Sequence, residues 1–170
     1  MIKILDNFFK EEDLRLIQNF AATQACYTPQ FFESTKEKNK ENYFGDRYYL
    51  DSNSELLSKF IKQAELKFKI NIKKINNTSG IDQRNLDHFK PHIDYPSTIN
   101  IMIMLKGINS ITNGTVFYDK DNDKYDLNVG FKENRAILFP SNHYHSQYAS
   151  DIPNMKRFTA TLFIQDYEEL

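Results

Sequence analysis

The second half of the chain is a succession of short segments whose composition is that of β-strands. Each segment is four to eight residues long and carries aliphatic, β-branched or aromatic residues, which is typical of strands. Turn-forming residues such as Asn113-Gly114 stand between the segments. So many short strands predict a β-sandwich or a jelly roll. The predicted strands are residues 83–89, 98–105, 115–118, 125–129, 136–140 and 158–164.

The first half of the chain contains two segments with the periodicity of amphipathic helices. In residues 11–23, apolar side chains recur three and four positions apart, and residues 55–68 repeat this pattern. Two further strands are expected at residues 2–5 and 43–50. Two helices ahead of many strands predict an α+β protein in which the helices back the sheets. Residues that can cap the second helix are Asp51, Ser52 and Ser54.

Length and composition predict one domain, residues 1–170, with a single core, because 40% of its residues are hydrophobic. The 22 basic and 23 acidic residues nearly cancel, so no strong field attracts a phosphate backbone. No nucleic-acid partner is therefore predicted. A lone cysteine, Cys26, excludes an internal disulfide, and we expect it to be a small buried hydrophobe.

The apolar runs of the chain are all too short to cross a bilayer, and none resembles a signal peptide. We therefore expect a cytoplasmic protein without a membrane partner. The sequence leaves the oligomeric state open.

The first pair of residues that can do chemistry together is His92 and Asp94. Side chains two positions apart in an extended segment point to the same side. His92 and Asp94 can therefore offer a nitrogen and a carboxylate oxygen to one point. An isolated His-x-Asp triplet is more often a hydrogen-bonded surface pair, so it needs further support.

The second pair is His143 and His145, which follow the apolar run of residues 136–140. A histidine at the end of a buried strand can enter a cavity between two sheets. Two histidines and one carboxylate, with coordination positions left open, form the facial triad of non-haem iron(II) oxygenases. At this point either histidine could complete the triad.

A third feature opens the last predicted strand, where Arg157 and Thr159 share one face. Arginine offers a planar fork of donors that suits bidentate binding of a carboxylate, and threonine adds a hydroxyl. Alone, such an arginine is more often paired with a structural acid. The order of the three features along the chain is far more specific than any one of them.

This order resembles that of the 2-oxoglutarate/iron(II) dioxygenase superfamily, in particular its prolyl 4-hydroxylase-like branch. The resemblance extends over most of the chain. Asn-Gly-Thr-Val-Phe at residues 113–117, for example, is similar to a glycine-rich strand entry of that branch. The segments that carry the resemblance are residues 4–9, 89–94, 113–118, 136–146 and 157–159.

The resemblance implies a double-stranded β-helix, a jelly-roll variant whose two sheets enclose the metal. It implies an oxidoreductase that holds Fe(II) with His92, Asp94 and His145 and binds 2-oxoglutarate as co-substrate through Arg157 and Thr159. Such a hydroxylase oxidises a C–H bond and converts 2-oxoglutarate to succinate, with ascorbate as an optional reductant. The branch favours a peptidyl proline or another protein side chain as substrate, and a small molecule is left open.

The sequence departs from the branch at two places. A tyrosine that contacts 2-oxoglutarate usually stands shortly before the His-x-Asp motif, where this chain has Asp-Gln-Arg at residues 82–84. Tyr49 and Tyr118 are the candidates to replace it. Many members also carry lysine where this chain has Arg157, which weakens the narrow assignment more than the broad one.

The choice between the histidines follows from the resemblance. Tyr-His-Ser fits the pattern around the distal ligand, so His145 is the predicted ligand. His143 then lies behind the ligands or on the substrate side, and His88 lies at the surface or behind the ligands. The charged segment of residues 27–42 is the predicted substrate-contacting loop.

Two other classes of function compete with the oxygenase. A cupin-like metal-binding or isomerase domain has the same architecture but does not need Arg157 and Thr159 on the last strand. A non-catalytic interaction module with a decayed site would not need the complete set of ligands. Binding of 2-oxoglutarate in the presence of metal separates these classes.

Overall fold

A computed structural model describes residues 1–31, 43–84, 91–119, 124–147 and 156–170. Two α-helices and eleven strands make up this part of the chain, with a 3₁₀ turn at Leu50–Ser52. The helices are α1 (Glu11–Thr23) and α2 (Ser54–Phe68). The strands are β1 (Lys3–Leu5), β2 (Thr28–Phe31), β3 (Tyr43–Tyr49), β4 (Ile70–Ile75), β5 (Gly80–Arg84), β6 (Ile99–Lys106), β7 (Ser110–Tyr118), β8 (Tyr125–Phe131), β9 (Arg135–Pro140), β10 (His145–Gln147) and β11 (Arg157–Glu169).

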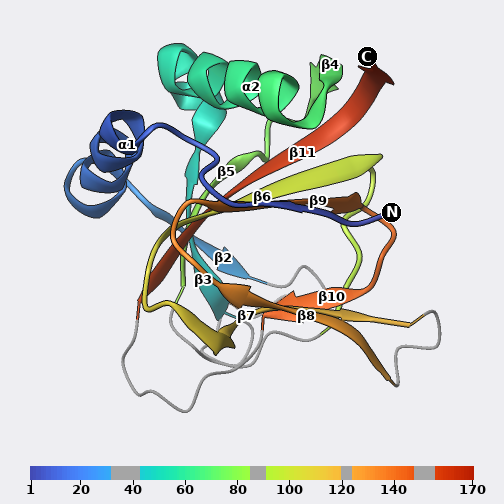
Figure 1. Cartoon of the computed structure of the whole chain (residues 1–170). Helices are drawn as coiled ribbons and strands as arrows, with labels where there is room; N and C mark the ends of the chain where they lie inside the picture. The colour runs from blue at the N-terminus through green and yellow to red at the C-terminus, as the bar shows by residue number, and fades with distance from the viewer. Residues whose placement is uncertain (32–42, 85–90, 120–123, 148–155) are drawn as a thin grey trace.

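The strands form two antiparallel sheets that lie opposite one another. The large sheet has the order β1-β9-β6-β11-β5-β3-β2, with β4 paired to the far part of β11, and the small sheet has the order β10-β7-β8. Figure 1 shows α1 and α2 on one side of the large sheet and the small sheet on the other. This is the jelly-roll arrangement backed by helices that the sequence predicts.

The position of strand β6 in the large sheet explains why its sequence is almost continuously apolar. Ile101 and Ile103 pack in the core beneath the helices, together with Phe60 of α2. Met104 belongs instead to a second core between the two sheets, with Phe117 of β7. Because side chains alternate along a strand and both faces of the large sheet are covered, nearly every position of β6 is buried.

The predicted helices are confirmed, but the cap of α2 differs from the prediction. The side chain of Asn53 accepts a hydrogen bond of 3.0 Å from the backbone N–H of Leu56. Residues Asp51 and Ser52 belong to the preceding 3₁₀ turn, and Ser54 is already the first helical residue. Asn53 is one of several adjacent polar residues that could cap a helix, and the periodicity of the helix alone does not identify which of them does.

No helix in the described ranges is long and apolar enough to cross a membrane.

The region around Gly114 corrects a second expectation. Asn113-Gly114 was expected to form a turn, but β7 runs through it, with an irregular register against β8 between Ser110 and Thr115. A Cβ atom at Gly114 would lie 2.0 Å from the carbonyl oxygen of Val129. Gly114 therefore allows β7 and β8 to approach each other closely and does not form a chain reversal.

Other differences concern segments with weak patterns. Strands β2 and β4 were not expected, and β11 continues well past the predicted end at residue 164. Cys26 is exposed, contrary to the expectation of burial. Of the expected strand at residues 83–89, only the start is described, and it belongs to β5.

Candidate active site

The three predicted metal ligands come from two segments that the backbone holds together. His92 and His145 form an isolated antiparallel bridge in which each backbone N–H donates to the carbonyl of the other, at 3.0 Å in both directions. The N–H of Asp94 donates to the carbonyl of Ser141 at 2.9 Å. Backbone hydrogen bonds thus join the segment that carries the His-x-Asp motif to the segment that leads into β10.

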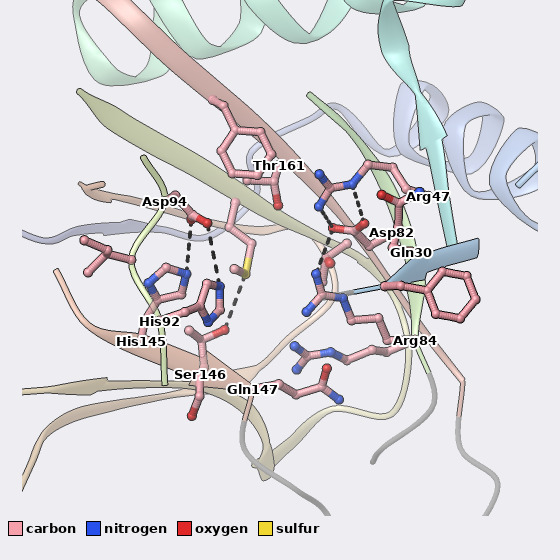
Figure 2. A pocket seen from close by; sticks show the side chains of 17 residues that line it. Gln30, Arg47, Asp82, Arg84, His92, Asp94, His145, Ser146, Gln147 and Thr161 are labelled. Atoms are coloured by element: carbon pink, nitrogen blue, oxygen red, sulfur yellow. Dashed lines mark hydrogen bonds and ion pairs between the residues drawn. The ribbon is translucent and has the colours of Figure 1, made fainter. Parts of the chain in front are cut away.

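These bridges bring the three side chains to one point, as Figure 2 shows. Asp94 Oδ1 lies 3.6 Å from His92 Nε2, and Asp94 Oδ2 lies 3.3 Å from His145 Nε2. One ligand atom from each residue lies within 4.8 Å of the other two. Metal–ligand bonds of about 2.0–2.2 Å leave neighbouring ligand atoms about 3 Å apart, so the cluster fits one metal ion.

The surroundings of the cluster orient its members. His145 Nδ1 lies 3.0 Å from the carbonyl oxygen of His143, and only the N–H tautomer can donate to a carbonyl. In the neutral ring, this tautomer leaves the lone pair on Nε2, the nitrogen nearer to Asp94, where a metal could bind. Asn100, which is fully buried, donates from Nδ2 to Asp94 Oδ2 at 2.6 Å. Burial favours a higher pKa for Asp94. A hydrogen bond from His145 and the positive charges of His145 and His92, in their protonated forms, outweigh burial, so the pKa is lowered.

His143 lies apart from this cluster. Its ring packs edge-on against Phe117, with centroids 5.4 Å apart, and its Nε2 is 3.9 Å from Asp126 Oδ2. The structure thus brings His145, rather than His143, to Asp94. His88 and residues 32–42 of the predicted substrate loop lie outside the described residues.

A cavity of about 410 Å³ extends from the cluster between the two sheets. Its polar lining includes both residues predicted to bind the co-substrate, Arg157 and Thr159 of β11. Both are buried, with 2% and 3% of their surface exposed. The same cavity therefore contains a candidate metal centre and a buried cation. Its other lining residues are Gln30, Phe31, Arg47, Asp82, Arg84, Ile93, Met102, Thr115, Ser146, Gln147, Thr161 and Phe163.

Arg157 is held by backbone carbonyls. Its Nη1 donates to the carbonyls of Asn113 and Gly114, at 3.2 and 2.8 Å, and its buried Nε has no hydrogen-bond partner. No carboxylate of the described residues forms an ion pair with it. Burial, followed by the nearby charge of Arg84, lowers the pKa of Arg157 to about 9, so it stays cationic at neutral pH. A buried cation without an acid suits an anionic ligand.

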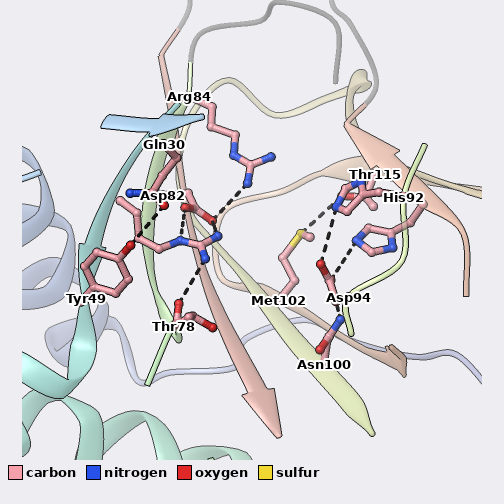
Figure 3. A network of polar contacts seen from close by, with 12 residues as sticks. Gln30, Tyr49, Thr78, Asp82, Arg84, His92, Asp94, Asn100, Met102 and Thr115 are labelled. Carbon is pink, nitrogen blue, oxygen red and sulfur yellow. Dashed lines mark hydrogen bonds and ion pairs between the residues drawn. The ribbon is translucent and has the colours of Figure 1, made fainter. Parts of the chain in front are cut away.

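A buried ion network that the sequence reasoning missed lines one wall of the cavity (Figure 3). Arg47 binds Asp82 through two contacts, Nε to Oδ1 at 2.7 Å and Nη2 to Oδ2 at 3.0 Å. Arg84 Nη2 lies 3.4 Å from Asp82 Oδ2. Burial alone would raise the pKa of Asp82, but the two arginines lower it. The signal in the sequence was the spacing of Asp82 and Arg84, which puts both on one face of a strand.

Tyr49 and Tyr118 are not among the residues that line the cavity. The hydroxyl of Tyr49 donates to Gln30 Oε1 at 3.1 Å. The hydroxyl of Tyr118 is hydrogen-bonded to that of Ser146 at 2.7 Å. Asp82 and Arg84 of the arginine-rich wall belong to the sequence segment in which the resemblance leads one to expect a tyrosine.

Solved structures with the same fold include several 2-oxoglutarate-dependent enzymes. A prolyl-4-hydroxylase from Pseudomonas putida is 10% identical and matches with a TM-score of 0.68, over 97% of this chain and 92% of that chain. A prolyl hydroxylase from Trichoplax adhaerens, in complex with a hypoxia inducible factor peptide fragment, is 14% identical, with a TM-score of 0.63 over 97% and 83%. The α-ketoglutarate-dependent epimerase SnoN of nogalamycin biosynthesis is 8% identical, with a TM-score of 0.63 over 98% and 79%.

These likenesses establish the fold. The chain has the jelly-roll architecture of 2-oxoglutarate/iron(II) oxygenases, which confirms the predicted double-stranded β-helix. No protein-family model matches the sequence, and no curated protein matches it either. At such low identity, fold alone does not fix activity, so function has to be argued from the cavity.

Proposed function

We propose that the chain is a single-domain Fe(II)- and 2-oxoglutarate-dependent oxygenase. The observation that carries this proposal is one cavity with a His-Asp-His cluster and a buried arginine that has no acid partner among the described residues. Two nitrogens and one carboxylate are the donor set of a non-haem Fe(II) site with open positions. When bound, the iron and 2-oxoglutarate activate dioxygen, with succinate and carbon dioxide formed from the co-substrate.

The residues of this chain have separate tasks in that reaction. His92, Asp94 and His145 hold the metal, and the bond from His145 Nδ1–H to a carbonyl fixes the ring for it. Arg157 and Thr159 bind the far carboxylate of 2-oxoglutarate, for which a guanidinium and a hydroxyl are suited donors. Arg157 and Thr159 are buried between the two sheets, and shielding from water strengthens charged contacts.

For the substrate, we propose hydroxylation of a C–H bond, with a peptidyl proline or another protein side chain as the first candidate. The support is the shared fold with two prolyl hydroxylases, one of which is in complex with a peptide fragment. SnoN, which has the same fold, is an epimerase acting in the biosynthesis of a small molecule. Substrate screening should therefore begin with proline-containing peptides and proceed to small molecules.

The first experiment adds Fe(II) and then 2-oxoglutarate to the purified protein without oxygen and records the visible spectrum. We expect a weak charge-transfer band, because 2-oxoglutarate chelates iron held by such a triad. Asp94→Ala should abolish both the band and stoichiometric iron binding. Asp126→Ala, which removes a largely exposed carboxylate of the small sheet, is the matched control and should keep both. Bound iron with no band would point to a cupin-like domain, and absence of bound iron would contradict the metal centre.

A further inference from the structure

We propose that Arg84 and Gln147 complete the site of Arg157, so that the far carboxylate of 2-oxoglutarate is held by two guanidinium groups and one amide. This inference rests on the proposed function. It assigns to this chain a carboxylate site formed by both sheets, in place of the tyrosine contact expected from the related branch.

The register of the large sheet puts the two arginines side by side. Arg84 of β5 is directly opposite Arg157 of β11 in the antiparallel pairing, and both side chains line the cavity. Like charges directly opposite one another on neighbouring strands repel. A carboxylate between them would replace that repulsion with two charge-assisted interactions.

Among the described residues, the acid of the arginine-rich wall, Asp82, binds Arg47 more closely than Arg84. Asp82 makes two contacts with Arg47, at 2.7 and 3.0 Å, whereas its contact with Arg84 is a single one at 3.4 Å. Burial lowers the pKa of both Arg84 and Arg157. The nearby charge of Arg47 lowers that of Arg84 further, and the charge of Arg84 lowers that of Arg157. An anion bound between the two groups would relieve both effects.

Gln147 approaches the same space from the opposite sheet. It stands two residues after His145 on β10, so both side chains lie on the face that lines the cavity. Gln147 is 7% exposed, and its buried Nε2 has no hydrogen-bond partner. In Figure 2 its side chain extends from the small sheet toward the side of Arg84. A buried donor without an acceptor is costly, and a ligand carboxylate would satisfy it.

The test compares two ligands that differ only at the far end. In 2-oxopentanoate, a methyl group replaces the far carboxylate of 2-oxoglutarate. Each ligand is titrated without oxygen into the Fe(II)-loaded protein, and the dissociation constant is measured by calorimetry. The ratio of the two dissociation constants isolates the contribution of the far carboxylate.

We expect Arg84→Gln to weaken 2-oxoglutarate binding about tenfold or more, the loss of one charge-assisted contact. It should leave the affinity for 2-oxopentanoate nearly unchanged. Gln147→Leu should show the same selectivity with a smaller loss, about threefold to tenfold. Arg15→Gln, at an exposed arginine of α1, is the control and should change neither constant. Circular dichroism and thermal unfolding of each variant verify the fold.

Three results would overturn the inference. Equal weakening of both ligands in Arg84→Gln would mean that this arginine acts only through the fold. Unchanged binding of both ligands in both variants would assign these side chains to the primary substrate or to structure. If the unaltered protein with bound Fe(II) does not bind 2-oxoglutarate at all, the proposed function itself fails, which the other two outcomes do not imply.

Discussion

The two ends of the cavity have opposite electrostatic requirements. At one end, Asp94 stands between two imidazoles, and its lone pairs and theirs converge on a point where a cation fits. At the other end, Arg84 and Arg157 stand opposite each other on two neighbouring strands, and both line the cavity. A ligand with a chelating end and an anionic end is complementary to both. The chemistry of the two ends therefore favours such a two-ended ligand, whatever the primary substrate is.

The ends also differ in how they are built. The metal end depends on a short motif and on backbone bridges, whereas the arginine end depends on strand register and on a buried ion pair. The metal end should therefore tolerate changes in the sheet better than the arginine end. One substitution at each end tests this difference, and a third, in a charge cluster outside the cavity, provides the reference.

The largest effect is expected at Asp82, the acid of the arginine wall. Asp82→Asn would leave two buried arginines without their carboxylate, which typically costs about 3–5 kcal/mol. We expect a loss of this size in the free energy of unfolding, measured by urea denaturation, while Fe(II) binding to the folded protein persists. Asp13→Asn removes a partly exposed ion pair with Lys59 and should cost about 1 kcal/mol at most. Similar losses in both variants would contradict the importance of the wall.

An intermediate effect is expected at Asn100, which donates a hydrogen bond to Asp94, a proposed metal ligand. Residues that orient a ligand typically contribute about 10–100-fold to metal affinity. Asn100→Ala should therefore weaken Fe(II) binding by a factor in that range, measured by competition with a chelator. Asn142→Ala, at an exposed position near the metal end, should have no effect. Unchanged affinity in Asn100→Ala would show that the backbone bridges alone position Asp94.

The smallest effect is expected at Asp6, outside the cavity. Asp6 pairs with Arg135 and Lys132, both at 2.7 Å, and hydrogen bonds from these residues lower its pKa from 3.8 to about 2. Because the folded-state pKa is the lower one, its contribution is complete above about pH 4 and disappears as the pH falls through 2. Asp6→Asn should lower the free energy of unfolding by about 0.5–1 kcal/mol at pH 7 and by progressively less as the pH falls through 2. A difference at pH 2 as large as that at pH 7 would exclude this electrostatic origin.

The sequence predicted the metal end of the cavity far better than the arginine end. His92 and Asp94 are two residues apart, so local geometry alone indicated that they act together. His145 was chosen over His143 only through the resemblance, because the backbone bridge that brings His145 to them joins segments far apart in the sequence. The pairing of Arg84 with Arg157 depends on the register of β5 against β11, and no local pattern encodes register. Strands β2 and β4 were missed because their polar and charged residues hide the alternation.

The reciprocal backbone bridge between His92 and His145 bears on whether the chain folds before or after it binds a metal ion. Its hydrogen bonds are formed by backbone groups, so the two segments can meet during folding whichever ion is present. The ligand side chains would then be brought together before an ion arrives, and binding would require little further ordering of the chain. A metal ion could then bind after the chain has folded, and a chelator should remove the ion without unfolding the protein.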